Sequence, residues 1–448
     1  MLYNKNIREK YERGKKSMRI LHTSDWHLGR TLEGRSRLDE QVAFIDELSG
    51  IVEDNAVDLI LIAGDVFDTV NPPAAAEELF YEALNRLSAG GRRGIVAIAG
   101  NHDNPERLCA AGPLAVRQGI TLYGLPKEVL LPSSSIFTQL NPGEGSTVRR
   151  AAAGQGWMEL AIPNCPPTIV AMLPYPSESR LNEVLSASLD EKILREEYSK
   201  RVQQLFTTFA QHYRPDAVNL GISHLFVRGG VESESERPIQ LGSAPTVEVN
   251  ALPVGAQYVA LGHLHRAQSV KGAPIPTRYS GSPLAYSFSE TGYAKSVVLI
   301  EAYPGQEVTT QEIFLRSGYP LVKWRAKEGL AQVQHWIDEG KDLNAWIDLE
   351  VFVSNSLQAQ DIHNLRRQRE RLINIRPVFP ETEKIAAEAR SKLPIDELFR
   401  KFYQDRMGGA EPEQELVAMF LSLIDPDNNE TTLLSDQQIG VDKEVESA

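Results

Sequence analysis

The stretch Ile20-Leu21-His22-Thr23-Ser24-Asp25-Trp26-His27-Leu28-Gly29 decides how the rest of this chain is interpreted. Its apolar beginning predicts a short strand, and an Asp-x-His pair follows where the strand ends. Side chains alternate with a period of two on an extended chain, so we expect Asp25 and His27 to lie on the same side of the backbone. A carboxylate and an imidazole placed together can bind one divalent cation. Because such pairs are common, the interpretation depends on ligands from other segments.

Strand and helix patterns alternate after this stretch. Apolar runs at 19–23, 58–63 and 94–99 predict strands. Apolar residues at helical spacing over 36–54, and a second helix opened by Pro72-Pro73, lie between these runs. This order of elements predicts an α/β fold with parallel strands under helices.

The middle of the chain predicts a second set of strands. Runs at 168–173, 217–223 and 257–261 have the apolar character of central strands, whereas the glycine-rich segment 143–156 is expected to be a loop. Runs at 293–301 and 308–314 are expected to close a second sheet.

Side chains of the kinds that bind metals stand at the carboxyl ends of five apolar runs. They are Asp25 and His27, Asp65, Asn101 with His102 and Asp103, His224, and His263 with His265. In open α/β sheets this edge is where ligands bind. Glycine precedes three of the groups, at Gly64, Gly100 and Gly262, and permits close approach of the backbone. His22 lies within its strand instead and is interpreted as a core histidine.

These residue types favour Mn, Fe, Zn or Co over Ca, with Mg the weaker candidate because of the histidines. Two cations held by seven ligands would leave positions for water and substrate, and could clamp a phosphate for in-line displacement. The ligands would be Asp25, His27, Asp65, Asn101, His224, His263 and His265. His102 would protonate the leaving oxygen or stabilise the transition state, with Asp103 orienting it.

Length and charge limit the possible functions. A chain of 448 residues predicts two or three domains. The net charge of −13 opposes nucleic-acid binding through the average field, so local basic patches, metal ions or a partner would have to supply the attraction. No apolar run reaches the roughly 20 residues of a membrane span, and residues 1–17 form a polar extension without the apolar core of a secretory signal. Cys109 and Cys165 are too few for a disulfide framework and are expected to be thiols in a reducing cytoplasm.

The character of the chain changes near residue 318. Strands at 321–326, 345–352 and 376–379, with helices at 330–339 and 357–372, predict a separate α+β unit over 318–388. The second of these helices would carry four arginines, as a solvated face or as a contact to phosphate backbones. They are Arg366, Arg367, Arg369 and Arg371.

Two short amphipathic helices follow within 389–424, and an acidic tail at 425–448 is expected to be disordered. The helices are too short to be stable alone in water. They would therefore either pack on their own domain or dock on a partner.

The motifs together resemble those of the calcineurin-like metallophosphoesterases: Asp-x-His, Gly-Asp, Gly-Asn-His-Asp, a single His and Gly-His-x-His. The wording RILHTSDWHLGR, LIAGDVFDTVNPP, AGNHD, ALGHLHRAQ and YSGSPLAYSF is similar to the SbcD family, the nuclease subunits of bacterial SbcCD complexes. This resemblance extends over about 18–300. It implies a metallophosphoesterase β-sandwich flanked by helices over 18–317.

The resemblance also implies an activity and partners. One ion would be held by Asp25, His27, Asp65 and His265, and the other by Asp65, Asn101, His224 and His263. The implied enzyme is a Mn²⁺-dependent 3′→5′ double-strand exonuclease and single-strand or hairpin endonuclease, with roles in DNA recombination, repair and replication. Its partner would be the coiled-coil ATPase SbcC, bound by the helices of 389–424, while 318–388 would cap DNA. The family pattern leaves open whether two copies pair through the phosphoesterase domain.

Asp68 stands where archaeal relatives carry a histidine linked to exonuclease action, and it either braces the turn or contributes to selectivity. Two other functions would use the same metal-binding residues or the same fold. A stand-alone phosphoesterase acting on other phosphate esters would need neither the α+β unit nor the terminal helices. A binding or scaffold protein with a degenerate site would be expected to lack part of the ligand set, and none of it is missing.

Overall fold

The computed structural model describes residues 17–136, 147–184, 190–232, 236, 246–354, 356–379, 394–406 and 411–424. The expectations for residues 1–16 of the N-terminal extension and for the acidic tail at 425–448 lie outside these residues. Within them, no helix is long and apolar enough to cross a membrane. Cys109 and Cys165 are free thiols, as expected.

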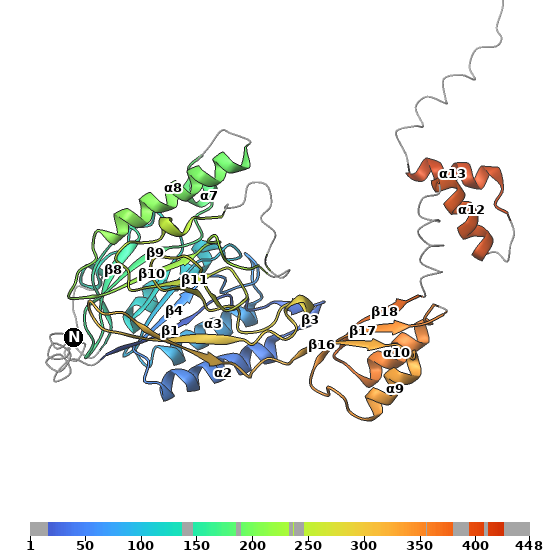
Figure 1. The fold of residues 1–448 in the computed structure, drawn as a ribbon, viewed down its shortest axis with the longest axis horizontal. Coiled ribbons are helices and arrows are strands. Elements are labelled where there is room, and N and C mark those ends of the chain that lie inside the picture. The colour runs from blue at the N-terminus through green and yellow to red at the C-terminus, as the bar shows by residue number, and fades with distance from the viewer. Residues whose placement is uncertain are drawn as a thin grey trace, which may run out of the picture. The chain divides into compact units, whose positions relative to one another are not determined.

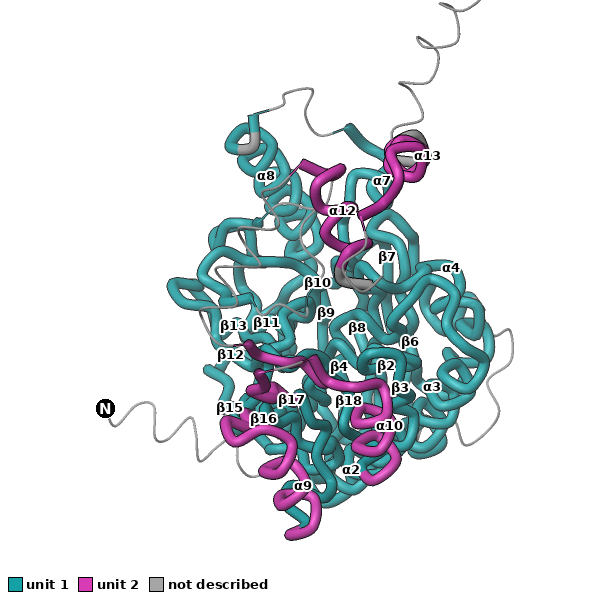
Figure 2. The backbone as a smooth tube through the Cα atoms, turned by 90° about the vertical axis from the view of Figure 1, so that its right-hand side faces the viewer, with its two compact units in different colours: residues 1–324, 340–348, 369–374 teal, residues 325–339, 349–368, 375–448 magenta. Residues whose placement is uncertain are grey.

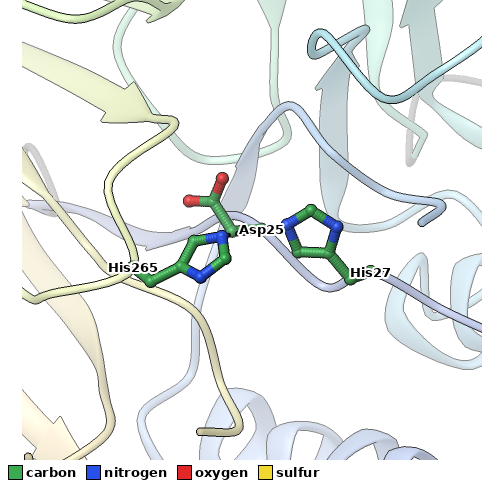
Figure 3. Close-up of side chains that lie close together, drawn as sticks. All are labelled: Asp25, His27 and His265. Atoms are coloured by element: carbon green, nitrogen blue, oxygen red, sulfur yellow. Dashed lines mark hydrogen bonds between the residues drawn. The ribbon is translucent and has the colours of Figure 1, made fainter. Parts of the chain in front are cut away.

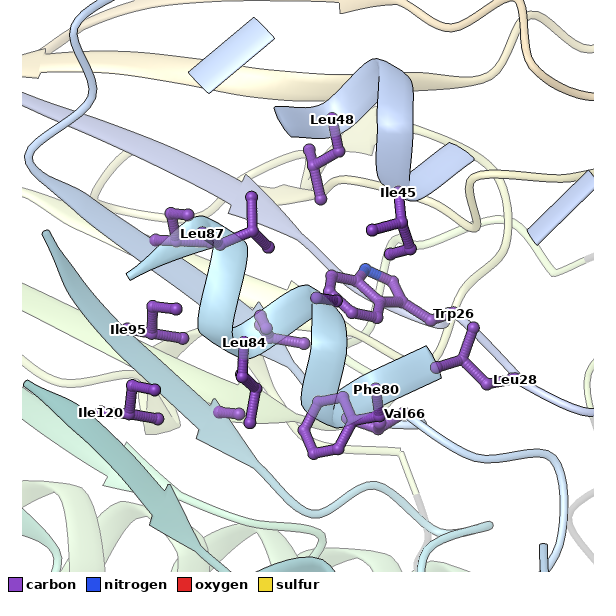
Figure 4. Packing of buried hydrophobic residues seen from close by; sticks show 14 of the residues in the cluster. Trp26, Leu28, Ile45, Leu48, Val66, Phe80, Leu84, Leu87, Ile95 and Ile120 are labelled. Carbon is purple, nitrogen blue, oxygen red and sulfur yellow. The ribbon is translucent and has the colours of Figure 1, made fainter. Parts of the chain in front are cut away.

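The first sheet has six strands in the order β15-β14-β1-β4-β5-β6. Its central strands β1 and β4, which pair with each other, are labelled in Figure 1. Four of them are parallel and confirm the βαβαβ prediction: β1 (Met18–Thr23), β4 (Leu59–Ala63), β5 (Gly94–Ile98) and β6 (Ile120–Tyr123). Helices α2 (Leu38–Asp54) and α3 (Ala74–Leu87) cover one face of this sheet. Figure 4 shows Trp26, Leu48, Phe80 and Leu87 packed in the core beneath them.

Strands β14 (Ser296–Ala302) and β15 (Thr309–Phe314) extend the first sheet, so the expectation that they close a second sheet is wrong. β14 pairs antiparallel with β1, and Ile300 lies opposite Ile20. The apolar pattern predicts that these segments are strands but does not predict which edge they join. Val298 and Ile300 face the core between the two sheets, a position that a strand of either sheet could fill.

The second sheet has seven strands in the order β12-β13-β11-β10-β9-β8-β7. Its parallel centre consists of β9 (Thr168–Leu173), β10 (Val218–His224), β11 (Tyr258–Gly262) and β13 (Thr277–Tyr279), with β12 (Gln268–Ser269) at one edge. Helix α8 (Glu191–Ala210) covers the outer face through Tyr198, Phe206 and Phe209. The inner faces of both sheets share one buried core, which confirms the predicted β-sandwich flanked by helices.

The segment 143–156 is not wholly a loop. Residues Arg149–Gly154 form β7, which pairs antiparallel with β8 (Trp157–Ala161). Alanine and glycine are poor indicators of a strand, so the pattern hid this hairpin. A hydrogen bond from the Gly156 nitrogen to the Tyr123 hydroxyl, at 3.0 Å, ties the turn of the hairpin to the end of β6.

The third sheet has the order β16-β17-β18, with bounds Leu321–Ala326, Trp346–Phe352 and Leu372–Val378. Helices α9 (Leu330–Asp338) and α10 (Ala359–Gln368) belong to the same segment of the chain. α10 ends at Gln368, so the predicted helical face of four arginines is wrong. Arg369 donates to the Leu343 carbonyl oxygen at 3.3 Å, and Arg371 lies over the ring of Tyr319 at 3.9 Å. Structural contacts therefore engage Arg369 and Arg371.

Two compact units divide the chain (Figure 2). The first comprises residues 1–324, 340–348 and 369–374, and the second comprises 325–339, 349–368 and 375–448. The predicted domain limits at 317 and 388 stay predictions. In the second unit, α12 (Ile395–Arg406) and α13 (Gln414–Ile424) pack on each other, and the rings of Phe399 and Phe420 are stacked at 4.0 Å.

Candidate metal centre

The sandwich brings five strand ends to one edge. The loop after β1 runs alongside the loop after β4, and the Asp25 and His27 nitrogens donate to the carbonyl oxygens of Gly64 and Asp65, both at 3.0 Å. In the second sheet, β10 and β11 are parallel, and His224 lies opposite Gly262. The predicted side chains from both sheets meet here, and most of them are buried. The buried ones are Asp25, His27, Asp65, His102, Asp103, His224, His263 and His265.

The backbone at several of these residues is in an uncommon conformation. Asp25, His27, Asp65 and His263 have φ angles of 54°, 44°, 49° and 103°. Such positive values cost of order 1–3 kcal/mol for a residue with a side chain, and they cluster at functional sites. The sequence led us to expect that Asp25 and His27 lie on one side of an extended strand, and this expectation is wrong. Both residues follow the end of β1, and their positive φ angles place them in left-handed turns.

Asp25, His27 and His265 form the first group of possible ligands (Figure 3). The Nε2 atoms of His27 and His265 are 3.1 Å apart. On the opposite sides of the two rings, His27 Nδ1 lies 3.4 Å from Asp68 Oδ1, and His265 Nδ1 lies 3.6 Å from Glu290 Oε1. Carboxylates at Nδ1 favour the proton there and leave the two Nε2 lone pairs facing each other. Two facing lone pairs are stable only with a cation or a shared proton between them.

His224, His263 and Asn101 form a second group. His224 Nδ1 donates to the Ala63 carbonyl oxygen at 2.9 Å, which directs Nε2 toward Asn101 Oδ1, also at 2.9 Å. His263 Nδ1 is 3.1 Å from the same Asn101 oxygen. Asp65 lies between the two groups, because its Oδ2 is 3.4 Å from His224 Nε2 and 3.7 Å from His27 Nε2.

The pKa values of these groups fit a site that holds a cation. Burial lowers the pKa of His27 and of His263 to about 3, so both rings are neutral as ligands must be. Burial also raises the pKa of Asp25 to about 6. Burial opposes a positive charge on His224. The carboxylates of Asp65 and, to a smaller extent, Asp25 nevertheless raise the pKa of this ring to about 9. A buried imidazolium thus balances the carboxylates, a role that divalent cations would fill more completely.

Two of the glycines are required by close approach. A Cβ atom on Gly100 would lie 2.1 Å from Asp65 Oδ1. A Cβ atom on Gly64, where φ is +88°, would lie 2.3 Å from His224 Nδ1. Both glycines therefore let ligand side chains lie against the backbone of the neighbouring strand end.

His102 is oriented by the main chain of Asp68. Its Nδ1 donates to the Asp68 carbonyl oxygen at 2.7 Å and lies 3.9 Å from the Asp68 carboxylate. Nε2 is then the atom that can exchange a proton with a substrate. The carboxylate of Asp103 instead accepts from the nitrogens of Val66, Phe67 and Gly100 at 3.2, 2.9 and 2.8 Å. Asp103 thus holds the backbone around His102.

The comparisons with known proteins agree with this geometry. The family described as calcineurin-like phosphoesterase matches residues 18–267. The SbcD component of nuclease SbcCD from Bacillus subtilis (strain 168) is 51% identical over 91% of this chain and 97% of its own length. The protein of the same name from Escherichia coli (strain K12) is 28% identical over 86% of this chain and 92% of its own length.

This chain belongs to the SbcD nuclease family. It is therefore a metal-dependent hydrolase that acts on phosphodiester bonds, and its clustered histidines and carboxylates fit divalent metal ions. The seven predicted ligands lie between Asp25 and His265 in the sequence. The structure brings all seven into one cluster.

His22 is a core histidine, as its place within the strand predicted. One of its ring nitrogens lies 3.0 Å from the Tyr258 hydroxyl and the other lies 3.1 Å from the Leu261 carbonyl oxygen. Burial lowers its pKa to about 3.

Sequence reasoning missed several residues that support the centre. The ring of Tyr286 packs against those of His27 and His265, with centroids 5.4 and 5.8 Å apart, and its hydroxyl donates to the Trp26 carbonyl oxygen. Glu290 also supports the centre. Burial opposes the negative charge of its carboxylate, but Lys295 and then His265 hold the pKa of Glu290 well below its usual range. Tyr286 lies within the stretch SPLAYSF, and Glu290 lies just after it. The spacing of this stretch matches no metal motif, so only the family resemblance indicates that it is important.

Proposed function

We propose that this chain is the nuclease component of a DNA-processing complex and that it binds two Mn²⁺ ions. Asp25, His27, Asp65 and His265 would hold one ion, and Asp65, Asn101, His224 and His263 would hold the other. The observation that carries the proposal is the position of Asp65, whose Oδ2 lies 3.4 Å from a nitrogen of the second group and 3.7 Å from a nitrogen of the first. Divalent ions at such a centre supply Lewis acidity to a phosphate ester.

The protein's own residues would complete the reaction. As an imidazolium, His102 would give its Nε2 proton to the leaving oxygen and become a neutral ring that keeps the Nδ1 proton on the Asp68 carbonyl oxygen, 2.7 Å away. Asp103 would act as a positioning residue through its three backbone contacts. Asp68 would fix the tautomers of both His27 and His102 from one side of the site.

The proposed substrate is DNA, with 3′→5′ exonuclease action on double strands and endonuclease action on single strands and hairpins. Support comes from the Bacillus subtilis relative, which is named as a component of nuclease SbcCD and whose length the match covers almost completely. The segment that contains the third sheet would contact DNA, and Arg366 and Arg367 on α10 are its candidate phosphate contacts. A metallophosphoesterase that acts on other phosphate esters is the alternative.

The proposed partner is a coiled-coil ATPase of the SbcC kind, as the name of the relatives suggests. Helices α12 and α13 are the candidate docking segment. Phe402 and Met419 on these helices are 58% and 63% exposed, which suits a contact made with another chain. Pairing of two copies through the phosphoesterase domain, and a cytoplasmic location, stay predictions.

The test is cleavage of end-labelled hairpin DNA with Mn²⁺ by wild-type protein and by His102→Ala. We expect the variant to lose about 10²–10⁴-fold in rate, because general acid catalysis contributes that much. Its Mn²⁺ content should equal that of wild type, since the ring is assigned no place among the ligands. His335→Ala is the matched control, because that ring, on α9, is 66% exposed and pairs with Glu339 at the end of the helix.

Full activity in His102→Ala would contradict the assigned role of the ring. Wild-type protein that hydrolyses a small phosphodiester with Mn²⁺ but leaves both linear and hairpin DNA intact would support the alternative function.

A further inference from the structure

Arg180 holds the loop that carries Asn101 and His102. Its Nη1 donates to the Gly100 carbonyl oxygen and its Nη2 donates to the Asp103 carbonyl oxygen, both at 2.6 Å. These two carbonyl groups stand immediately before and after the pair of site residues. Arg180 itself lies in the short helix α7 (Glu178–Leu181), about 80 residues further along the chain.

The position of Arg180 is itself fixed by its neighbours. The Ser177 hydroxyl accepts from the Arg180 nitrogen at 3.3 Å, at the start of α7. The guanidinium lies over the ring of Tyr175, 5.4 Å from the centroid, and the Tyr175 nitrogen donates to the Ala99 carbonyl oxygen at 3.0 Å. The segment that follows β9 is therefore attached to the segment that follows β5 at three successive points.

Most other recorded bonds of this loop run to the segment that follows β4, so Arg180 adds a support from the second sheet. Residues Asn101 to Asp103 belong to no helix or strand. Within the loop, the Asp103 carboxylate accepts a hydrogen bond from the Gly100 nitrogen at 2.8 Å. Arg180 lies outside the loop and binds its carbonyl oxygens. Because a guanidinium presents its donors in a rigid planar fork, it can set the distance between two carbonyl groups in a way that a flexible ammonium does not.

The loop geometry matters for two side chains of the site. Asn101 Oδ1 lies between ring nitrogens of His224 and His263, at 2.9 and 3.1 Å. The backbone nitrogen of His102 donates to Asp65 Oδ1 at 2.8 Å. A shift of the loop would therefore also move the Asp65 carboxylate, which lies between the two groups of ligands.

We propose that Arg180 is a positioning residue, which fixes the loop so that Asn101 completes the His224–His263 side of the centre and His102 faces the substrate. The proposal rests on the proposed function, in which that side holds one of two ions. Arg180 acts through the loop, because the two recorded hydrogen bonds of its guanidinium go to main-chain oxygens.

The test compares full-length wild-type protein with Arg180→Ala and Arg180→Lys. Calorimetric titration of Mn²⁺ into the chelator-treated proteins should show one ion bound by Arg180→Ala with wild-type affinity. The second ion should bind about 10–100-fold more weakly, the range found when outer residues of metal sites are changed. With saturating hairpin DNA and Mn²⁺, kcat should fall by a similar factor of about 10–100 while KM changes little.

Chemical rescue separates positioning from a general loss of structure. Millimolar guanidinium should restore part of the second-ion affinity and of kcat in Arg180→Ala and have no effect on wild type. Arg180→Lys keeps the charge but not the planar fork, so its second-ion affinity should fall between those of the other two proteins. It also serves as the measurement if Arg180→Ala does not fold.

Arg201→Ala is the matched control. Arg201 also comes from the region after β9, but within the described part of the chain its recorded side-chain bonds go to the Glu183 carboxylate, at 2.7 and 2.6 Å, and to Gln204. It should keep both binding steps and the wild-type kcat.

Wild-type second-ion affinity and kcat in folded Arg180→Ala would overturn the proposal. So would a rise in KM alone, because it would make Arg180 a substrate contact. Failure of wild-type protein itself to bind two ions would contradict the proposed function, which separates the two claims.

Discussion

At the scale of single residues, chemical identity was predictable and local conformation was not. The ligand types at five strand ends indicated the centre because each type has a known preference for metals. The left-handed turns at Asp25 and His27 have no signal in the sequence, since neither residue is a glycine. Arg180 likewise followed no motif, because its contacts are to main-chain oxygens that every residue offers.

Gly100→Ala tests the close packing at the centre. The added Cβ would lie 2.1 Å from Asp65 Oδ1, so the backbone or the carboxylate must move. We expect a loss of about 1–3 kcal/mol in the free energy of unfolding and about tenfold weaker Mn²⁺ binding. Urea denaturation and metal titration measure the two effects.

Gly50→Ala provides the contrast for that variant. Gly50 lies within α2, where a Cβ would meet nothing within 4 Å. Alanine is the better helix former, so stability should rise by up to about 1 kcal/mol with metal binding unchanged. Equal losses of stability and metal affinity in both variants would contradict the packing argument.

At the scale of elements, the apolar patterns located the central strands of both sheets and missed what depends on distant contacts. Strand β14 pairs with β1, about 280 residues away in the sequence, and no local pattern encodes this pairing. Helix α10 ends before Arg369 because β18 begins at Leu372, although the local sequence continues to favour a helix. The alanines and glycine of β7 have low strand propensity, so the sequence does not predict its hairpin with β8.

A buried ion pair ties the start of α2 to the segment that enters β16. Arg37 and Glu40 are almost completely buried and form a two-point contact. Glu40 also accepts from the Tyr319 nitrogen at 2.7 Å and from Trp346 Nε1 at 3.0 Å. Glu40→Ala would leave Arg37 buried without its partner, at a cost of about 3–5 kcal/mol.

Thermal and urea unfolding of Glu40→Ala and Asp46→Ala check this prediction. Asp46 is the matched control on the same helix, because its pair with Arg86 is at the surface and the Asp46 side chain is 59% exposed. Its loss should cost less than about 1 kcal/mol. Similar shifts in both variants would show that burial does not distinguish the two pairs.

At the scale of the whole molecule, charge and the terminal helices bear on how the enzyme finds DNA. A chain with a net charge of −13 gains little from long-range attraction to a polyanion. We therefore expect DNA to be attracted locally, by the metal ions of the centre and the arginines of α10, or through a partner. The helices α12 and α13 share an aromatic contact between half-buried rings, and Ile395 is 49% exposed.

Deletion of residues 390–448 tests the role of these helices. The metal centre lies in the other compact unit, so Mn²⁺-dependent cleavage of hairpin DNA should stay within about twofold of wild type. Co-purification with the co-expressed ATPase should be lost. Retained binding of the partner by the truncated protein would contradict the docking proposal.

The number of Mn²⁺ ions bound per chain decides whether the centre holds two metals. Elemental analysis after equilibrium dialysis should find about two ions in wild-type protein and about one in His224→Ala, whose Nε2 faces both Asp65 and Asn101. A single ion in wild-type protein, or an equal count in His224→Ala, would contradict the account.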